Sequence, residues 1–356
     1  MSKLYFFKGF FPNEFFMKTA EYIASVQETD GSIPWFEGGY TDPWDHTEAA
    51  MGLSICGKYQ EAERAYDWMR ETQNADGSWW NAYKNGSIED KSRIETNFVA
   101  YVATGVWHHF LITQDKRFLS KMWPVVRNAI EFVLSLQTKY GEISWAVGQE
   151  NDIKNDALIT GCSSIFKSLE CAINIATVLE KKKPQWISSR NNLGHTIKNH
   201  PERFDRTWES KSRYSMDWFY PVLAGVITGP AARSRINAKW DKFVVDNLGC
   251  KCVSDEPWVT IAESCELTMA LIGAGQHKKA SQLFNWLHDY REENGSYWTG
   301  YVFTKDELWP VEKPTWTAGA ILLAADALAQ ATPASQLFTR VSLIDAVESS
   351  KSINYA

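Results

Sequence analysis

Two kinds of hydrophobic pattern alternate along most of the chain. In the first, apolar residues recur every three or four positions among charged ones, which is typical of an amphipathic helix that lies on a core. In the second, small and apolar residues fill nearly every position, which indicates a helix buried on all sides. The amphipathic segments include 60–73, 115–137, 184–200 and 230–247, and the apolar ones are 47–56, 96–111, 157–179, 215–228, 260–275 and 315–330.

Six apolar segments, each paired with an amphipathic one, predict a single all-α ring of six helical hairpins, an (α/α)6 toroid. The apolar helices would form the inner ring and the amphipathic helices the outer ring. We expect the inner helices to start near residues 46, 95, 156, 215, 260 and 315. Residues 1–332 would form the barrel and residues 333–356 a C-terminal tail.

A short motif repeats at the ends of four amphipathic helices. An aromatic and an aliphatic residue are followed by a glutamine or arginine, then by a glycine, and then by a tryptophan within two to four residues. The glycine supplies the positive φ that ends a helix, and the long polar side chain can bond backbone groups left unpaired there. We therefore expect Gln27, Gln73 and Gln137 to be structural staples between hairpins. The polar residue and glycine of the copies are Gln27 and Gly31, Gln73 and Gly77, Gln137 and Gly141, and Arg291 and Gly295.

This motif resembles the QW repeat of terpenoid cyclases and protein prenyltransferases. The six-hairpin layout also resembles the six-hairpin glycosidases, and the whole chain resembles uncharacterised bacterial proteins described as prenyltransferases. The resemblance implies the toroid and leaves the chemistry open. The Asp-x-Asp-Asp motif of proton-initiated cyclases is absent, with Asp42-Pro-Trp-Asp45 as the nearest approach.

Composition narrows the choice of partner and compartment. The formal charge of −6 over 356 residues argues against binding to nucleic acid, and the chain has no apolar run long enough for integral membrane association. Six scattered cysteines indicate buried thiols in a reducing compartment, so we expect a cytoplasmic protein. We expect no cofactor and no metal site, because Cys250 and Cys252 are too close for a usual zinc pair.

The loops that lead into the inner helices are rich in carboxylates and aromatic residues, and they should converge at one mouth of the ring. The chain has 17 Trp, 14 Tyr and 18 Phe, and aromatic side chains between carboxylates are typical of a carbohydrate cleft. The predicted substrate-binding residues are Trp35, Asp42, Trp44, His46, Trp80, Arg213, Tyr214, Trp218, Trp258, Trp298, Tyr301 and Trp316.

For catalysis we predict Asp45 and Asp217 as the acid and base, with Glu95 and Glu263 in reserve. Hairpins one and four lie opposite each other in a six-fold ring, so Asp45 and Asp217 would face each other. Structural roles compete with this hypothesis: Asp45 with Glu48, and Thr260 with Glu263, have the spacing of helix capping boxes. His46 could likewise cap a helix or fill a loop.

The favoured function is a carbohydrate-active, glycoside hydrolase-like enzyme that acts on a small-molecule or oligosaccharide substrate. Charged groups lining a hydrocarbon pocket would be costly, which weakens the first alternative, a terpenoid cyclase or prenyltransferase-like enzyme that binds an isoprenoid. The second alternative is a non-catalytic binding toroid. Hydrolysis, elimination and epimerisation all remain open, as does a retaining or inverting outcome.

Overall fold

The computed structural model describes Leu4 and residues 6–344. Helices dominate these residues and alternate between the two rings. The inner helices are α2 (Pro43–Ile55), α4 (Thr96–Thr113), α6 (Ile159–Val178), α8 (Ser215–Leu223), α11 (Ile261–Gly273) and α13 (Thr315–Ala329). The outer helices are α1 (Asn13–Val26), α3 (Tyr59–Thr72), α5 (Lys116–Ser135), α7 (Pro184–Asn199), α9 (Gly229–Ala238), the short α10 (Trp240–Phe243) and α12 (His277–Trp286).

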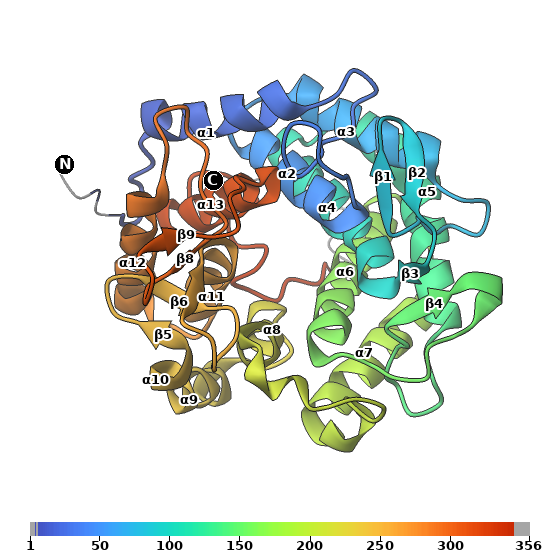
Figure 1. Cartoon of the computed structure of the whole chain (residues 1–356). Helices are drawn as coiled ribbons and strands as arrows, with labels where there is room; N and C mark the ends of the chain where they lie inside the picture. Colours follow the sequence, from blue (N-terminus) through green and yellow to red (C-terminus); the bar gives the residue numbers. More distant parts are fainter. Residues whose placement is uncertain (1–3, 5, 345–356) are drawn as a thin grey trace.

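The inner helices form a closed ring, seen along its axis in Figure 1. Each packs against the next in the order α2, α4, α6, α8, α11 and α13, and α13 packs back against α2. Their first residues lie within three positions of the predicted starts. The predicted all-α toroid is therefore confirmed. Its fifth outer helix is shorter than expected, because α9 ends at Ala238 and α10 follows as a separate turn.

The repeated motif joins neighbouring outer helices. The side-chain amide of Gln73 donates to the carbonyl of Gly77 in its own loop and to that of Val125 in α5, at 2.9 and 3.0 Å. Gly77 has φ +95°, and a Cβ there would collide with the backbone of Asn128, so only glycine fits. The predicted staple is confirmed for all three glutamines. Its other links run from Gln27 to Glu61, from Gln137 to Ser189, and from Arg291 to Phe15, which closes the ring.

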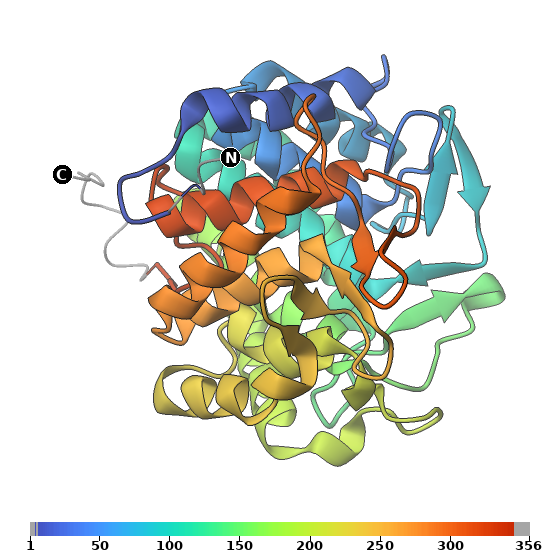
Figure 2. The same ribbon diagram turned by 60° about the vertical axis from the view of Figure 1, so that its left-hand side comes forward.

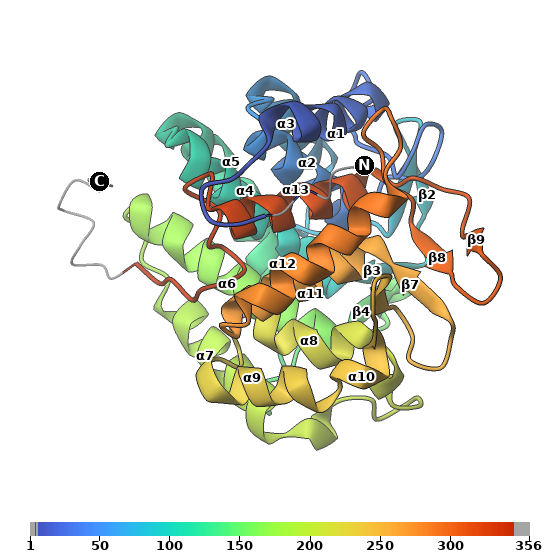
Figure 3. The ribbon, with the colours of Figure 1, turned by 90° about the vertical axis from the view of Figure 1, so that its left-hand side faces the viewer.

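The nine short strands of the described residues gather at the end of the ring where the inner helices begin, on the right-hand side of Figure 3 and visible obliquely in Figure 2. We call this end the mouth. All pairings are antiparallel, and segments of two to four residues are too short to show a sequence periodicity. The sheets are β1 (Ala82–Lys84) with β2 (Ser87–Asp90), β3 (Arg93–Glu95) with β4 (Ala146–Gly148), and β5 (Val244–Val245), β6 (Gly249–Lys251), β7 (Trp258–Thr260), β8 (Gly300–Val302) and β9 (Glu307–Leu308).

The opposite end of the ring is crossed by the last described segment of the chain. The carboxylate of Glu170 in α6 bonds to Lys167 at 2.8 Å and to Arg190 at 2.6 Å, and all three side chains are buried. Lys167 also donates to the carbonyl of Arg340, and Glu170 accepts from the amide of Ser342. The predicted tail therefore packs on the barrel as far as residue 344, and its remaining residues, 345–356, lie outside the described ones.

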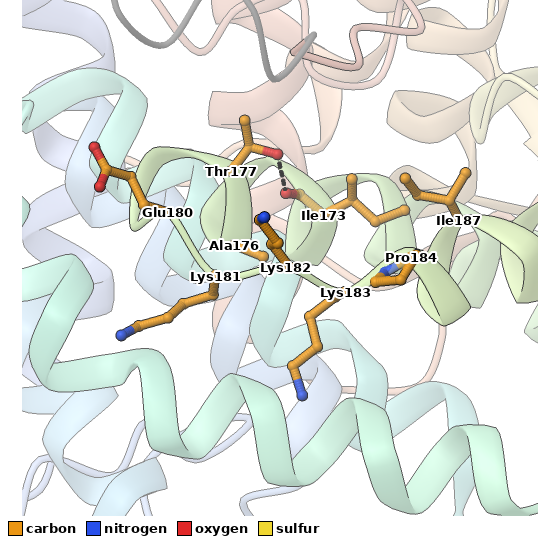
Figure 4. A pocket seen from close by; sticks show the side chains of 9 residues that line it. All are labelled: Ile173, Ala176, Thr177, Glu180, Lys181, Lys182, Lys183, Pro184 and Ile187. Atoms are coloured by element: carbon orange, nitrogen blue, oxygen red, sulfur yellow. Dashed lines mark hydrogen bonds between the residues drawn. The ribbon is translucent and has the colours of Figure 1, made fainter.

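A surface pocket of about 450 Å³ also lies away from the mouth, at the turn between α6 and α7. Figure 4 shows apolar residues such as Ile173 and Ile187 beside three successive lysines. Lys181 and Lys182 are exposed, whereas Lys183 reaches Glu131 at 2.5 Å.

Elsewhere in the described chain, all six cysteines are free, and no helix is both long and apolar enough to cross a bilayer.

Candidate active site

The first carboxylate at the mouth caps an inner helix. Asp42 is the N-cap of α2, and one of its oxygens accepts the backbone amides of Trp44 and Asp45, both at 2.9 Å. Its other oxygen accepts the indole N–H of Trp35 at 2.6 Å. These bonds fix Asp42 rigidly. They also correct the expected Asp45–Glu48 capping box, since the cap lies three residues earlier.

Asp45 lies on the first turn of α2, beside the cap, and is partly exposed. Its carboxyl group shares a hydrogen bond with that of Asp42, in which Asp42 accepts. Burial holds the pKa of Asp45 well above its usual range, and the charge of Asp42 and this hydrogen bond raise it further. Asp45 is therefore suited to carry a proton and to donate it.

Glu48 lies one turn deeper on the same face of α2. It is 3% exposed and bonds to the hydroxyl of Tyr101, 3.4 Å away, and to the indole of Trp44. The Trp44 and Tyr101 rings stack with their centroids 4.3 Å apart. Burial raises the pKa of Glu48 to about 8. At neutral pH Glu48 is thus mostly a neutral carboxylic acid at the floor of the mouth.

Two further carboxyl groups come from α11. Glu266 is buried next to Glu48 and near Tyr220, and burial raises its pKa well above the usual range. Glu263, one turn nearer the mouth, is 9% exposed, and its Oε2 has no hydrogen-bond partner among the described residues. The side chain of Thr260 makes no capping bond, so the expected Thr260–Glu263 capping box is not formed.

Together these residues form one group, which we call the carboxyl cluster: Asp42, Asp45, Glu48, Glu263 and Glu266. Helices α2 and α11 bring it together because both pack against α13, which lies between them. Within the described residues, none of the five forms an ion pair with a cationic side chain. Nor do any three His, Cys, Asp or Glu side chains of that part of the chain group in a way that would hold a metal ion.

A cluster of this kind can supply both halves of acid–base catalysis. Burying several carboxylates without cations is costly, and proteins relieve that cost by keeping some of them protonated. The cluster therefore combines at least one proton donor that reaches the surface with an acceptor oxygen that no protein group occupies. Cleavage of a glycosidic bond requires such a pair of carboxyl groups.

Asp217 does not belong to the cluster. Its charged neighbours are Asp205, Arg235 and Lys239, and Arg235 lies in the outer helix α9. Arg235 also donates to the backbone carbonyl of Asp217, at 2.9 Å. The charged neighbours of Asp45 are instead other members of the cluster. The structure thus does not bring Asp217 opposite Asp45 as the sequence had predicted, because Asp217 is directed toward the outer ring.

Four predicted substrate-binding residues are buried: Asp42 and Trp44, which belong to the contacts described above, and His46 and Trp218, which lie in the core. His46 is fully buried: its Nδ1 accepts a backbone amide at 3.0 Å, and its Nε2 lies 2.9 Å from the carbonyl of Ala65. Burial lowers its pKa to about 4, so the ring is neutral. Trp218 is 1% exposed and stacks on Phe243, with its indole N–H bonded to backbone. Both side chains are structural, so neither is available to a substrate.

The other predicted residues keep some exposure. Glu95 lies at the edge of the carboxyl cluster, with Asp42 among its charged neighbours, but it has its own counter-charge in Arg93 at 2.7 Å. Arg213 forms a bidentate pair with Asp255. Partly or largely exposed side chains at the mouth are Trp35, Trp80, Arg213, Tyr214, Trp258, Trp298 and Tyr301, together with Trp316 on the first turn of α13.

Four residues of the candidate site were not among the predicted catalytic or substrate-binding residues: Glu48, Glu266, Tyr101 and Tyr220. The two glutamates follow Asp45 and Glu263 by three residues, a spacing that places both members on one helix face. That signal was present in the sequence. The tyrosines give no such signal, because a tyrosine in an apolar helix is usually part of the core.

Comparisons with known proteins agree with a sugar-cleaving site. No family model matches the chain. The chain is 50% identical over 326 residues to the "MMP endo-(1,4)-3-O-methyl-alpha-D-mannosidase" of Mycolicibacterium hassiacum, which covers 92% of this chain and 89% of that enzyme.

Solved structures share the fold at low sequence identity. One described as "Glycosidase Wild Type" has a TM-score of 0.70 at 14% identity and covers 92% of this chain and 97% of its own. A D-mannose isomerase has a TM-score of 0.67 at 11% identity, and the match covers 88% of this chain and 95% of the isomerase. The fold alone is thus compatible with more than one sugar reaction. The 50% identical relative decides between them: this chain is a glycosidase and belongs to the family of the endo-(1,4)-3-O-methyl-α-D-mannosidase.

Proposed function

We propose that the protein is an endo-acting α-mannosidase that hydrolyses 1,4 bonds between 3-O-methylmannose units within an oligosaccharide chain. The observation that carries this proposal is the 50% identity, over 92% of the chain, to an enzyme with that activity in its name. The partly exposed aromatic residues at the mouth support it, because aromatic side chains are usual platforms for sugar rings.

We propose Asp45 as the general acid. It combines a position at the surface of the carboxyl cluster with a raised pKa, and Asp42 accepts its hydrogen bond. Its proton would pass to the glycosidic oxygen as the bond from that oxygen to the sugar C1 breaks, which lets the leaving sugar depart as an alcohol.

Glu263 is the proposed base, and it takes the place that the sequence had given to Asp217. Its free Oε2 would accept a proton from a water molecule while the water oxygen bonds to C1. One water molecule is consumed. One of its hydrogens stays on the new C1 hydroxyl, and the other passes from Glu263 back to Asp45, which replaces the proton that Asp45 gave to the leaving sugar. Glu48 and Glu266 would stay protonated beneath and donate hydrogen bonds to sugar oxygens.

The test is hydrolysis of a defined 1,4-linked 3-O-methyl-α-mannoside oligosaccharide, followed by mass spectrometry of the products. Internal cleavage by the native protein is expected, with kcat lower by roughly 10²–10⁴ in Asp45→Asn and in Glu263→Gln. Asp217→Asn is the matched control and should retain most of the activity. Release of single sugars from one end only would contradict the endo mode, and an inactive Asp217→Asn with an active Glu263→Gln would contradict the assignment.

The alternatives have less support. An isomerase is suggested only by a fold shared at 11% identity, and conversion of free mannose without hydrolysis of any glycoside would favour it. The terpenoid or prenyltransferase-like alternative gains nothing from the relatives described above. A cytoplasmic location stays part of the proposal, supported by six cysteines that are all free.

A further inference from the structure

One segment of the mouth spans the gap between the two helices that carry the carboxyl cluster. Residues 309–315 lead into α13, which lies between α2 and α11. On the α11 side, the amide of Trp309 donates to the carbonyl of Gly300 in β8, and the indole of Trp258 in β7 donates to the carbonyl of Trp309 at 2.8 Å. On the α2 side, the amide of Thr315 donates to the carbonyl of Trp35, in the loop before α2, at 2.6 Å. We call residues 309–315 the rim.

The two anchors of the rim are next to the two halves of the cluster. Trp258 precedes Glu263 by five residues in the same strand–helix unit, β7 and α11. Trp35, at the other anchor, donates its indole N–H to Asp42. The rim is thus linked to both of the hairpin units that carry Asp45 and Glu263.

The rim presents apolar side chains to solvent at this place. Trp309 is 49% exposed and Val311 is 77% exposed. The Trp309 ring meets that of Trp258 edge to face, with centroids 5.1 Å apart. The Trp258 indole rests directly on Gly300, where a Cβ would collide with it. Backbone bonds at both ends anchor the segment that carries these side chains, which reduces the ordering of the backbone needed when a ligand binds.

We propose that Trp309 and Val311 form the subsite that recognises the O-methyl group of a methylated mannoside chain, with the Trp309 ring against the sugar and Val311 against the methyl. This proposal rests on the proposed function. An unmethylated mannose would place a hydroxyl against an apolar surface, whereas the methyl ether buries an apolar carbon there. The rim would thereby select methylated chains, a selectivity that the carboxyl cluster has no means of providing.

The experiment compares kcat/KM on two 1,4-linked α-mannoside oligosaccharides of equal length, one 3-O-methylated and one unmethylated. Val311→Thr keeps the side-chain shape and replaces a methyl with a hydroxyl, so the preference for the methylated substrate should fall by about five-fold. Trp309→Ala should lower kcat/KM on both substrates by about ten-fold or more, because the sugar platform is lost. Tyr59→Ala, an exposed aromatic at the start of α3 and far from the mouth, should change neither value.

The outcomes separate this inference from the function on which it rests. An unchanged methyl preference in both Val311→Thr and Trp309→Ala, in a protein whose Asp45→Asn variant is inactive, would overturn the inference and leave the hydrolase standing. Failure of the native protein to cleave either oligosaccharide would overturn both. As a control for folding, each variant is expected to unfold at the same temperature as the native protein, so that a change in kcat/KM reflects binding and not loss of structure.

Discussion

The two ends of the ring bury ionisable side chains in opposite ways. At the far end, the Glu170 carboxylate lies between the cations of Lys167 and Arg190, and backbone groups of the last described segment complete the set. At the mouth, five carboxyl groups lie together without a cationic partner among the described residues. Most members of both groups are buried, and in the carboxyl cluster only Asp45 is partly exposed, so burial alone does not explain the difference.

This contrast separates a structural cluster from a functional one. The far cluster compensates its charges, and its cost to stability is largely offset by its own attractions. The carboxyl cluster is not compensated, and such an arrangement lowers stability unless protons are retained. Uncompensated groups that shift each other's pKa are characteristic of catalytic sites. This contrast supports the proposal that the mouth is the reactive end of the molecule, although both ends are rich in polar residues.

The largest effect on stability is expected from breaking the far cluster. Glu170→Gln leaves Lys167 and Arg190 buried without their carboxylate, so the free energy of unfolding should fall by about 3–5 kcal/mol. Urea or thermal unfolding measures this loss. Glu131→Gln is the control, because its pair with Lys183 is half exposed and should contribute less than about 1 kcal/mol. Equal effects of the two substitutions would show that the far cluster is not a compensated, stabilising unit.

At the mouth, removal of a carboxyl group should raise the free energy of unfolding instead of lowering it. The pKa of Glu48 is about 8 in the folded protein, above its value in the unfolded chain, so the folded state binds the extra proton. The stability of the folded state associated with this bound proton is fully present below about pH 4.5 and is lost as pH rises toward 8. Glu48→Gln should then raise the free energy of unfolding by about 3 kcal/mol at pH 7 and leave it unchanged at pH 4. A gain of equal size at both values, or a loss at pH 7, would contradict this account.

A smaller effect is expected at the staples, where a neutral polar group is fully hydrogen-bonded. Gln73→Ala removes two bonds to backbone carbonyls and should cost about 1–2 kcal/mol of stability. The specific activity per folded molecule should stay at the native value, since Gln73 lies in the outer ring. A variant with native thermal unfolding but no activity would show that the staple acts in catalysis.

The ring could be predicted from the sequence because its signal is long and periodic. Helices such as α4 and α13 are apolar over whole turns, and the staple glutamines repeat at fixed spacing. The strands were missed because segments of two to four residues show no periodicity, as in the local hairpin of β1 and β2. Others depend on pairing with a distant segment, as when Arg93 pairs with Gly148. Local sequence contains no record of such a partner.

The site could be predicted only in part. The mouth and the roles of Asp42, Asp45 and Glu263 as candidates followed from their position at inner-helix starts. Asp217 has an equivalent position, yet its charged neighbours include Arg235 of the outer helix α9 and no member of the carboxyl cluster. The direction of a first-turn side chain depends on the packing of its own hairpin, and hydrophobic periodicity does not record it.

The most direct test of the central claim, that the carboxyl cluster provides a separate acid and base, is a substrate that needs no acid. Fluoride leaves a glycosyl fluoride without first being protonated. On a methylated α-mannosyl fluoride of two or three sugars, Asp45→Asn should therefore turn over within about ten-fold of the native protein, although it is nearly inactive on the glycoside. Glu263→Gln should be inactive on both substrates. Equal inactivity of Asp45→Asn on the fluoride and the glycoside, or normal hydrolysis by Glu263→Gln, would contradict the assignment of these two residues.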